Sequence, residues 1–169
     1  ALYKLDIPTI AAVNGPAGGA GCDLTRYCDM RIASTEATFA ESFIKVGIIP
    51  GDGGAWILPK VAGYGRAAEM AFTGEGISAQ RAYDWGMLNK LVEPCALMDE
   101  AYSLAKRIAK NPPQALRATK QLMRAATNMP LDTLLQMSAG IQANLHQTED
   151  HLEAVKALIE KREPEYKGK

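Results

Sequence analysis

The hydrophobic and polar positions of the chain predict short strands alternating with helices in its first half. An apolar run at residues 9–13 is typical of a buried strand, and Pro8 before it favours extended backbone. The same pattern predicts extended segments at residues 30–33, 38–40 and 88–92. Helical spacing of apolar residues is found at residues 19–27, from about residue 55, and at residues 66–72 and 79–85. This alternation predicts an α/β fold.

From residue 97 onward the pattern is helical throughout. Prolines interrupt it at Asn111-Pro112 and Met129-Pro130, because a proline cannot continue a helix. Helices are expected at residues 97–109, 113–127, 131–145 and 149–161, and a tail at residues 164–169. The length of 169 residues fits one domain by size. Within it, residues 1–95 are expected to form the core and residues 96–169 a helical appendage.

The segment from Ile10 to Leu24 runs from an apolar strand through a glycine-dense turn into a helix. Glycines allow positive φ and close approach of a ligand, and the first amides of a helix have no acceptor within the helix. With the positive end of the helix dipole, these amides favour an anion. A second glycine-rich loop at residues 47–54 precedes another helical pattern, so two loops are expected to converge on one ligand.

Composition narrows the functional classes. Lys plus Arg and Asp plus Glu number 19 each, so no general attraction for nucleic acid or anionic membrane is expected. No apolar run approaches the roughly 20 residues that span a bilayer. The cysteines Cys22, Cys28 and Cys95 suggest neither a disulfide framework nor a zinc site, which favours a reducing, cytoplasmic location.

Three carboxylates are candidates for acid and base chemistry. Asp23 lies in the first turn of the helix after the glycines, Glu41 follows a short strand, and Asp52 lies inside the second glycine loop. Paired carboxylates in one pocket suit proton transfer. Each also has a structural alternative: Asp23 could stabilise the helix start, Glu41 could be a solvated charge, and Asp52 could form a turn.

Other reactive residues have simpler interpretations. Cys22 lies at a helix N-terminus, where a thiol pKa can fall, but a small buried residue is commoner there. His146 and His151 have no ligand-spaced partner and are expected to be solvated. Lys161 and Arg162 either bind phosphate or complement a helix dipole. Neither the G-x-G-x-x-G fingerprint of dinucleotide binding nor a P-loop is present, and no serine and histidine suggest a serine protease.

Several separated motifs together resemble the crotonase superfamily of enoyl-CoA hydratases and isomerases. The resemblance rests on residues 7–15, residues 18–24, Cys28-Asp29, residues 47–51 and residues 160–162. It implies a spiral of ββα turns followed by an α-helical trimerisation region, in a homotrimer or a dimer of trimers. It also implies that the chain is the C-terminal two-thirds of a subunit, with a second oxyanion-hole donor upstream of residue 1.

The resemblance implies a role for particular residues. The Ala20 amide, flanked by Gly19 and Gly21, corresponds to one oxyanion-hole donor for a thioester enolate. Hydratases of the family use two glutamates; Asp23 stands at the first position and Phe43 at the second, with Glu41 two residues earlier. Asp52 lies one residue after a position that supplies a base in some members. Lys161 corresponds to a position near the CoA nucleotide.

The resemblance implies an enzyme that acts on acyl-CoA thioesters and needs no cofactor other than the CoA of its substrate. An enoyl-CoA hydratase is the first hypothesis, with Asp23, Glu41 or Asp52 moving the protons. An isomerase is the second, because it needs only one well-placed base. A catalytically degenerate CoA-binding or scaffold subunit is the third, because Phe43 cannot transfer a proton.

Overall fold

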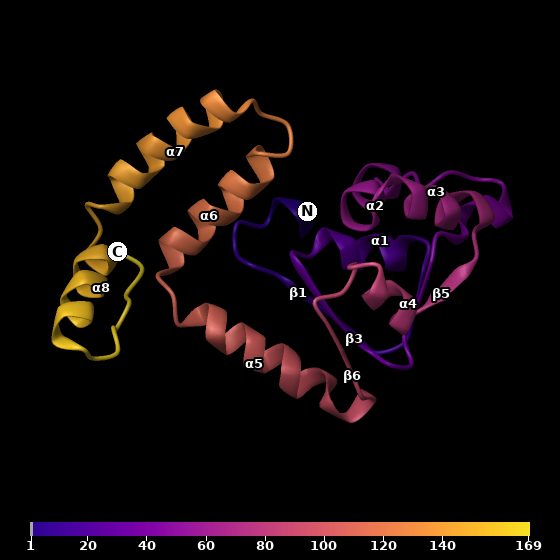
Figure 1. The fold of residues 1–169 in the computed structure, drawn as a ribbon, viewed down its shortest axis with the longest axis horizontal. Helices are drawn as coiled ribbons and strands as arrows, with labels where there is room; N and C mark the ends of the chain where they lie inside the picture. Colours follow the sequence, from indigo (N-terminus) through magenta and orange to yellow (C-terminus); the bar gives the residue numbers. More distant parts are fainter. Residues whose placement is uncertain (1) are drawn as a thin grey trace. The chain divides into compact units, whose positions relative to one another are not determined.

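A computed structural model describes residues 2–169 and shows an α/β protein (Figure 1). The chain divides into two compact units, although its length alone suggests one. The first unit contains residues 2–4 and Thr9–Leu104, and the second contains Leu5–Pro8 and Ala105–Lys169. The boundary falls between residues 104 and 105, inside one helix and not in a linker.

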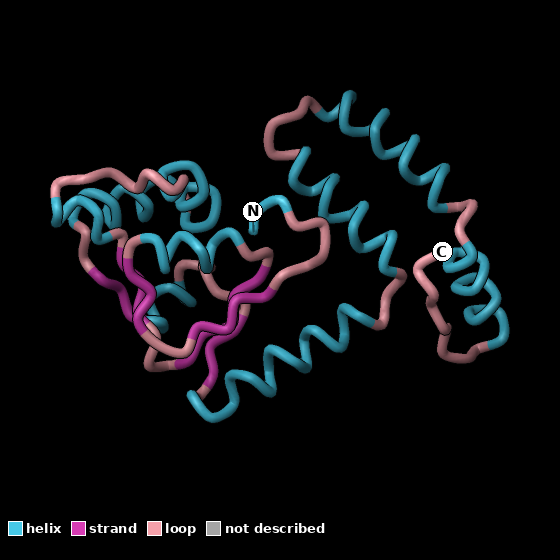
Figure 2. The backbone as a smooth tube through the Cα atoms, turned by 180° about the vertical axis from the view of Figure 1, so that it is seen from behind, coloured by secondary structure: helices cyan, strands magenta, loops and turns pink. Residues whose placement is uncertain are grey.

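The first unit holds two small sheets, visible as the magenta segments of Figure 2. In the first sheet, β3 (Met30–Ser34) lies between β1 (Ile10–Val13) and β6 (Lys90–Val92), and all three strands are parallel. In the second sheet, β4 (Thr38–Ala40) pairs in parallel with β2 (Pro16–Gly18) and antiparallel with β5 (Gly76–Ser78). The expected strands are confirmed, whereas β2 and β5 were missed. Both strands contain glycine, a residue that is typical of turns and weakens a strand.

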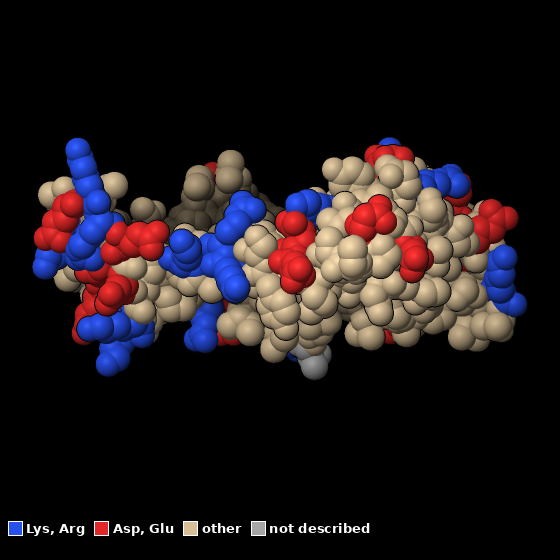
Figure 3. Space-filling view, turned by 90° about the horizontal axis from the view of Figure 1, so that it is seen from below, with Lys and Arg blue, Asp and Glu red and all other residues tan. Residues whose placement is uncertain are grey.

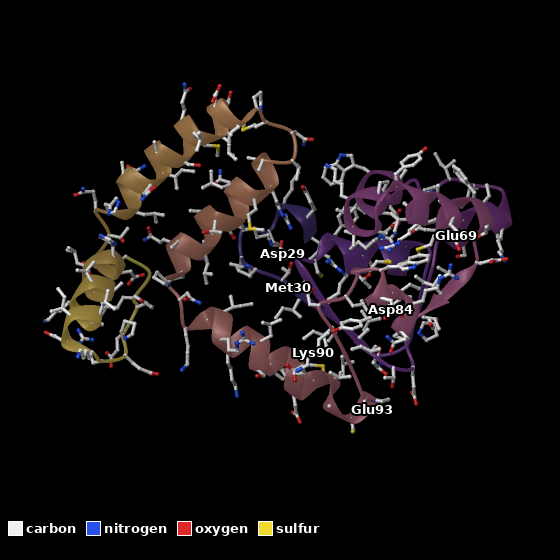
Figure 4. The ribbon with its side chains drawn as sticks, in the orientation of Figure 1. Asp29, Met30, Glu69, Asp84, Lys90 and Glu93 are labelled. Atoms are coloured by element: carbon white, nitrogen blue, oxygen red, sulfur yellow. The ribbon has the colours of Figure 1, made fainter. Side chains whose placement is uncertain are left out.

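Asp29 fixes the register of the first sheet. Its Oδ2 accepts hydrogen bonds from the Thr9 backbone N–H at 2.7 Å and from the Thr9 hydroxyl at 2.9 Å. These contacts join the entries of β1 and β3 and place Ile10 opposite Met30. Asp29 and Met30 are labelled at this point in Figure 4. The Cys28-Asp29 motif therefore has a structural role in this chain.

The helices of the first unit begin and end close to the predicted positions. They are α1 (Ala20–Tyr27), α2 (Gly54–Ala62), α3 (Tyr64–Thr73), α4 (Ala79–Asp84) and the start of α5 (Leu97–Ala109), with 3₁₀ turns at Leu2–Lys4, Ser42–Val46 and Pro94–Ala96. Ser78 caps α4 by accepting the Arg81 N–H at 3.2 Å. Gly74 ends α3 in the left-handed conformation that glycine favours.

The core of the first unit lies between its sheets and helices. Phe39, Leu58, Met70 and Met87 are each at most 2% exposed and belong to one apolar cluster. A second cluster joins Ile32 of β3 to the first turns of α5. Burying a side chain of this size contributes about 1.5–3 kcal/mol, so these clusters fix the elements that carry the site described below.

The second unit is helical and contains α6 (Pro113–Ala125), α7 (Leu131–Leu145) and α8 (Glu149–Glu160). The expected tail at residues 164–169 is wrong, because Asp150 accepts the backbone N–H groups of Lys167 at 2.7 Å and Gly168 at 2.9 Å. Lys120 similarly donates to the Ile7 carbonyl at 2.6 Å. Both ends of this unit are therefore held by a polar side chain at a helix.

The surface carries charges of both signs. Figure 3 shows basic and acidic side chains side by side on the face in view. None of the helices between residues 2 and 169 combines the length and the apolar character needed to cross a bilayer. Within the same residues, no cluster of three or more His, Cys, Asp or Glu side chains is arranged to hold a metal ion.

Candidate active site

The glycine turn presents the first amides of α1 at its end. Gly19 has φ of 51°, which an L side chain rarely adopts, and its N–H donates to the Ala40 carbonyl at 2.9 Å. This bond ties the turn to the end of β4. Ala20 is the first helical residue and is exposed, so its N–H is one of those that a helix leaves unpaired internally. Gly21 follows in the same turn.

Asp23 and Glu41 meet at one buried cation. Asp23 comes from α1 and Glu41 from the end of β4, and the same nitrogen of Arg26, Nη2, forms ion pairs with Asp23 Oδ1 and Glu41 Oε1. All three residues are at most 2% exposed. Asp23 lies in the first turn of α1, as its structural alternative requires, but Gly19 and not Asp23 is the N-cap residue. The alternative of a solvated Glu41 is wrong.

Burial changes the proton affinity of this cluster. It raises the pKa of Asp23 to about 8; the neighbouring Asp52 and Glu41 carboxyl groups raise it too, and Arg26 acts in the opposite direction. For Arg26 burial lowers the pKa, but Cys22, Glu41 and Asp23 outweigh that effect and the pKa is raised. Asp23 therefore keeps a proton near neutral pH while Arg26 stays charged.

Part of the polar surface of the cluster lacks a partner. Asp23 Oδ2, Glu41 Oε2 and Arg26 Nε are buried without a hydrogen bond to any group in residues 2–169. Leaving a buried polar atom unsatisfied costs about 1–3 kcal/mol, so such atoms are uncommon outside functional sites. A carboxyl group with one oxygen bound and one oxygen available is suited to exchanging a proton with a ligand.

The second glycine loop packs directly on α1. A side chain at Gly54 would overlap the Asp23 carboxyl group, and one at Gly53 would overlap the Tyr27 hydroxyl. The Tyr27 hydroxyl donates to the backbone carbonyl of Asp52 at 2.7 Å. This contact brings the loop, and the exposed Asp52 itself, to the edge of the carboxylate cluster.

An apolar cavity of about 280 Å³ opens beside Glu41. Its wall combines the 3₁₀ turn after β4 with the glycine loop, α2 and α3, and includes Phe43, Ile48, Leu58, Ala67 and Phe72. Glu41 is the only ionisable carboxylate on this wall, and Gly54 joins the wall to Asp23. A hydrocarbon chain with a polar reactive end fits such a cavity better than a charged ligand does.

The other residues that the sequence singled out, Cys22, the two histidines and Lys161, are not part of the carboxylate pair. Cys22 is buried, and burial raises the pKa of its thiol to about 11, so the alternative of a reactive thiolate is wrong. His146 and His151 are hydrogen-bonded to each other at 3.0 Å. Lys161 lies in the second unit, exposed at the C-terminus of α8 with φ of 55°. Its predicted contact with CoA stays a prediction.

Sequence reasoning missed Arg26. The residue lies three positions after Asp23, on the side of α1 that also carries Cys22, and its Nη1 donates to the Cys22 sulfur at 2.8 Å. An acid and a base three residues apart on a helix are neighbours, so this spacing was the available signal. What the spacing does not reveal is that this side of the helix faces the protein interior.

Comparison with known proteins identifies the family. The model of the enoyl-CoA hydratase/isomerase family matches residues 1–169. The 1,2-epoxyphenylacetyl-CoA isomerase of Escherichia coli K12 is 40% identical over 168 residues, which are 99% of this chain and 64% of that protein. The short-chain-enoyl-CoA hydratase of Clostridium acetobutylicum is 40% identical over 164 residues, 97% of this chain and 63% of that enzyme.

Solved structures agree with the sequence relatives. The crystal structure of an enoyl-CoA hydratase from Bacillus anthracis matches with a TM-score of 0.96 and 39% identity, over 99% of this chain and 65% of that one. The chain thus spans slightly less than two thirds of the length of these relatives. The likeness in sequence and fold extends over the whole chain, and the resemblance of its motifs is confirmed. The chain therefore belongs to the enoyl-CoA hydratase/isomerase family of the crotonase superfamily.

Proposed function

We propose that the protein acts on acyl-CoA thioesters, and that it hydrates a 2-enoyl-CoA. The observation that carries the proposal is the pair of buried carboxyl groups, Asp23 and Glu41, beside an apolar cavity. Hydration needs one group to take a proton from water and one to give a proton to carbon. A relative 40% identical to this chain is named a short-chain-enoyl-CoA hydratase.

The reaction follows from the protonation of the pair. Glu41, on the cavity wall, takes a proton from water while the water oxygen bonds to C3 of the enoyl group. The C2–C3 π electrons move toward the thioester, whose oxygen becomes an enolate held by the Ala20 N–H. Asp23, protonated near neutral pH, gives its proton to C2. Water is thus added across the double bond, and a proton passing from Glu41 to Asp23 restores the starting state.

The test is turnover of a panel of 2-enoyl-CoA thioesters of increasing acyl length. We expect loss of the conjugated enoyl absorbance and incorporation of ¹⁸O from labelled water. Asp23→Asn and Glu41→Gln should each lower kcat by about 100-fold or more, since general acid or base catalysis typically contributes about 10²–10⁴-fold. Glu36→Gln, an exposed glutamate after β3, is the matched control and should keep full activity. Absence of turnover across the panel would refute the proposal.

An isomerase is the second candidate. It is favoured by the third carboxylate, Asp52, beside Asp23, and by the 40% identity to an enzyme named 1,2-epoxyphenylacetyl-CoA isomerase. Moving a double bond transfers a proton between two carbons and adds no oxygen. Product of unchanged mass, without ¹⁸O, therefore distinguishes isomerisation from hydration. Retained CoA binding without turnover, unchanged in Asp23→Asn, would instead favour a degenerate binding subunit.

We further propose that the helices of the second unit mediate a homotrimer or a dimer of trimers. The support is α7, in which no residue is buried and Leu131 and Leu135 are 67% and 55% exposed. Large apolar patches exposed on a single chain are typical of interfaces. A cytoplasmic location is proposed too, supported by the three cysteines, which form no disulfide within residues 2–169. Lys161 is proposed as a contact to the CoA nucleotide.

A further inference from the structure

Arg26 is the one member of the buried cluster to which neither the motifs nor the proposed reaction gives a role. It lies at the inner side of α1, 2% exposed, between Asp23 of its own helix and Glu41 from the end of β4. A single guanidinium nitrogen donates to both carboxyl groups, so the two acids are held next to each other. A second nitrogen, Nη1, donates to the Cys22 sulfur and fixes the orientation of the guanidinium plane.

The charges of this cluster do not cancel when both acids are ionised. Two carboxylates facing one guanidinium leave one excess negative charge, and a buried excess charge is costly. Retaining one proton on the pair removes that excess. With Arg26 replaced by an apolar side chain, the pair would face the interior without any cation, and it would hold its proton to higher pH.

We propose that Arg26 is a positioning residue that holds Asp23 and Glu41 as one buried pair sharing a single proton, and so divides the acid and base roles between them. This inference rests on the proposed function and deepens it. Asp23 Oδ2 and Glu41 Oε2 remain without a partner among residues 2–169, which leaves one oxygen of each acid for substrate and water. Arg26 does not touch the substrate; it acts through the two carboxyl groups.

Other groups also act on the pair and must be accounted for in any pH profile. Cys22 and Tyr27 face it from α1, Asp52 from the glycine loop, and Arg31 interacts with Arg26 from β3. The pKa of the Cys22 thiol is raised to about 11, and burial raises that of Tyr27, so neither loses a proton near neutral pH. Arg31 donates to the carbonyl groups of Met87 and Cys28 and is bound to backbone.

The first experiment is the pH profile of kcat in Arg26→Met and Arg26→Lys. In the wild type, activity should fall as Asp23 loses its proton near pH 8. A positive charge favours the ionised acid, so removing it in Arg26→Met should shift this fall in activity, the alkaline limb of the pH profile, to higher pH by about one unit or more. Misplaced acids should lower kcat by about 100-fold, with little change in KM because the apolar residues of the cavity wall are unchanged. Arg26→Lys keeps the charge and should restore the limb and part of kcat.

The matched control is Arg81→Met, which removes an arginine from an exposed pair with Glu69 at 2.6 Å. It should leave both kcat and the pH limb unchanged. A purely structural Arg26 would lower the melting temperature and the active fraction of Arg26→Met but leave the limb of the remaining enzyme in place. That result, or an unchanged kcat, would overturn the inference.

A second measurement does not depend on turnover or on the folding of Arg26→Met. The infrared band of the protonated Asp23 carboxyl group, assigned with Asp23→Asn, should disappear at higher pH in Arg26→Met/Glu41→Gln than in Glu41→Gln, because these two proteins differ only in the guanidinium group that favours the ionised acid. A band that titrates at the same pH in both proteins would contradict the role of Arg26. If no 2-enoyl-CoA thioester is turned over, the proposed reaction is refuted. The infrared titration still tests the role of Arg26, because it needs no substrate.

Discussion

Gly54, which has no side chain, leaves room for the carboxyl group of Asp23. It is buried at the start of α2, and a Cβ atom there would overlap the Asp23 carboxyl group. Its backbone conformation is not restricted to glycine, so the requirement is space. The Asp23 carboxyl group can therefore occupy its place beside Arg26 only because the residue facing it at the start of α2 has no side chain.

The substitution Gly54→Ala is expected to displace the Asp23 carboxyl group and to destabilise the protein. Overpacking a tight interior site costs about 1–3 kcal/mol, measurable by urea unfolding. The control is Gly65→Ala at the start of α3, where a Cβ meets no atom within 4 Å. That change should stabilise by about 0.4–1 kcal/mol, because alanine loses less backbone freedom on folding. Equal effects of the two substitutions would contradict the close approach of Gly54 and Asp23.

The protonation of Asp23 should also make the free energy of unfolding depend on pH. Its pKa rises from 3.8 to about 8 on folding, so the folded protein holds a proton that the unfolded chain releases in this range. The stability from this proton is complete below about pH 4 and is lost as the pH rises to about 8.

Asp23→Asn removes this titration, and its free energy of unfolding should fall less steeply between about pH 5 and pH 8. The slopes should differ by up to about 1.4 kcal/mol per pH unit, the value for one proton. Urea unfolding at several pH values gives both slopes. Asp84→Asn, at an exposed carboxyl group that accepts from Gln80 at 2.8 Å, should follow the wild type. Parallel curves for wild type and Asp23→Asn would show that Asp23 titrates normally.

At the scale of secondary-structure elements, two carboxylates of α8 bind the segment at the end of the chain: Glu153 accepts the Glu165 N–H at 3.0 Å, and Asp150 binds the last residues. Asp150 is 2% exposed in the first turn of α8, and it accepts two backbone N–H groups from residues 167 and 168. Its own N–H donates to the Lys169 carbonyl at 3.2 Å. The segment after α8 is thus held by the hydrogen bonds that its backbone N–H groups donate to side chains of α8.

Asp150→Ala is expected to release this segment and to destabilise the second unit by about 1–3 kcal/mol, because the N–H groups of residues 167 and 168 lose a charged acceptor. Hydrogen exchange at residues 167–169 should accelerate, while exchange in β3 should be unaffected. Glu163→Ala is the control. The Glu163 side chain is 90% exposed, and its ion pair with Lys110 Nζ is long, at 3.5 Å. Slow exchange at residues 167–169 in Asp150→Ala would mean that other contacts hold the segment.

At the scale of the whole molecule, the two units bury their apolar residues differently. The first unit has an apolar cluster around Phe39 and Met70, whereas α7 of the second unit has no buried residue. A helix with exposed leucines is stabilised when another surface covers them. This difference supports the proposed association of chains through the helical unit.

Sedimentation velocity should therefore show three or six copies of the chain. Leu135→Glu places a charge in the proposed interface and should shift the distribution toward a single copy. Asn144→Glu adds the same charge to α7 at an exposed polar position and should leave the assembly intact. A wild-type protein that sediments as a single copy would rule out the trimer.

The sequence by itself determined the order and type of most elements, because each follows from local periodicity and from prolines and glycines. It also singled out Asp23 and Glu41 as candidates. The strands β2 and β5 were not predictable, since their glycines resemble turns and only pairing with β4 makes them strands.

Tertiary structure alone decided which charges surround Asp23 and Glu41. Asp23 and Glu41 are 18 positions apart, and only the bond from Gly19 to Ala40 and the packing of α1 bring them to Arg26. Burial, a property of the whole fold, raises the pKa of Asp23 and keeps Arg26 charged. The periodicity of a sequence indicates which residues can lie in the interior. Long-range packing decides which charged groups lie close together there, and the electrostatic energy of each group depends on its distances to the others.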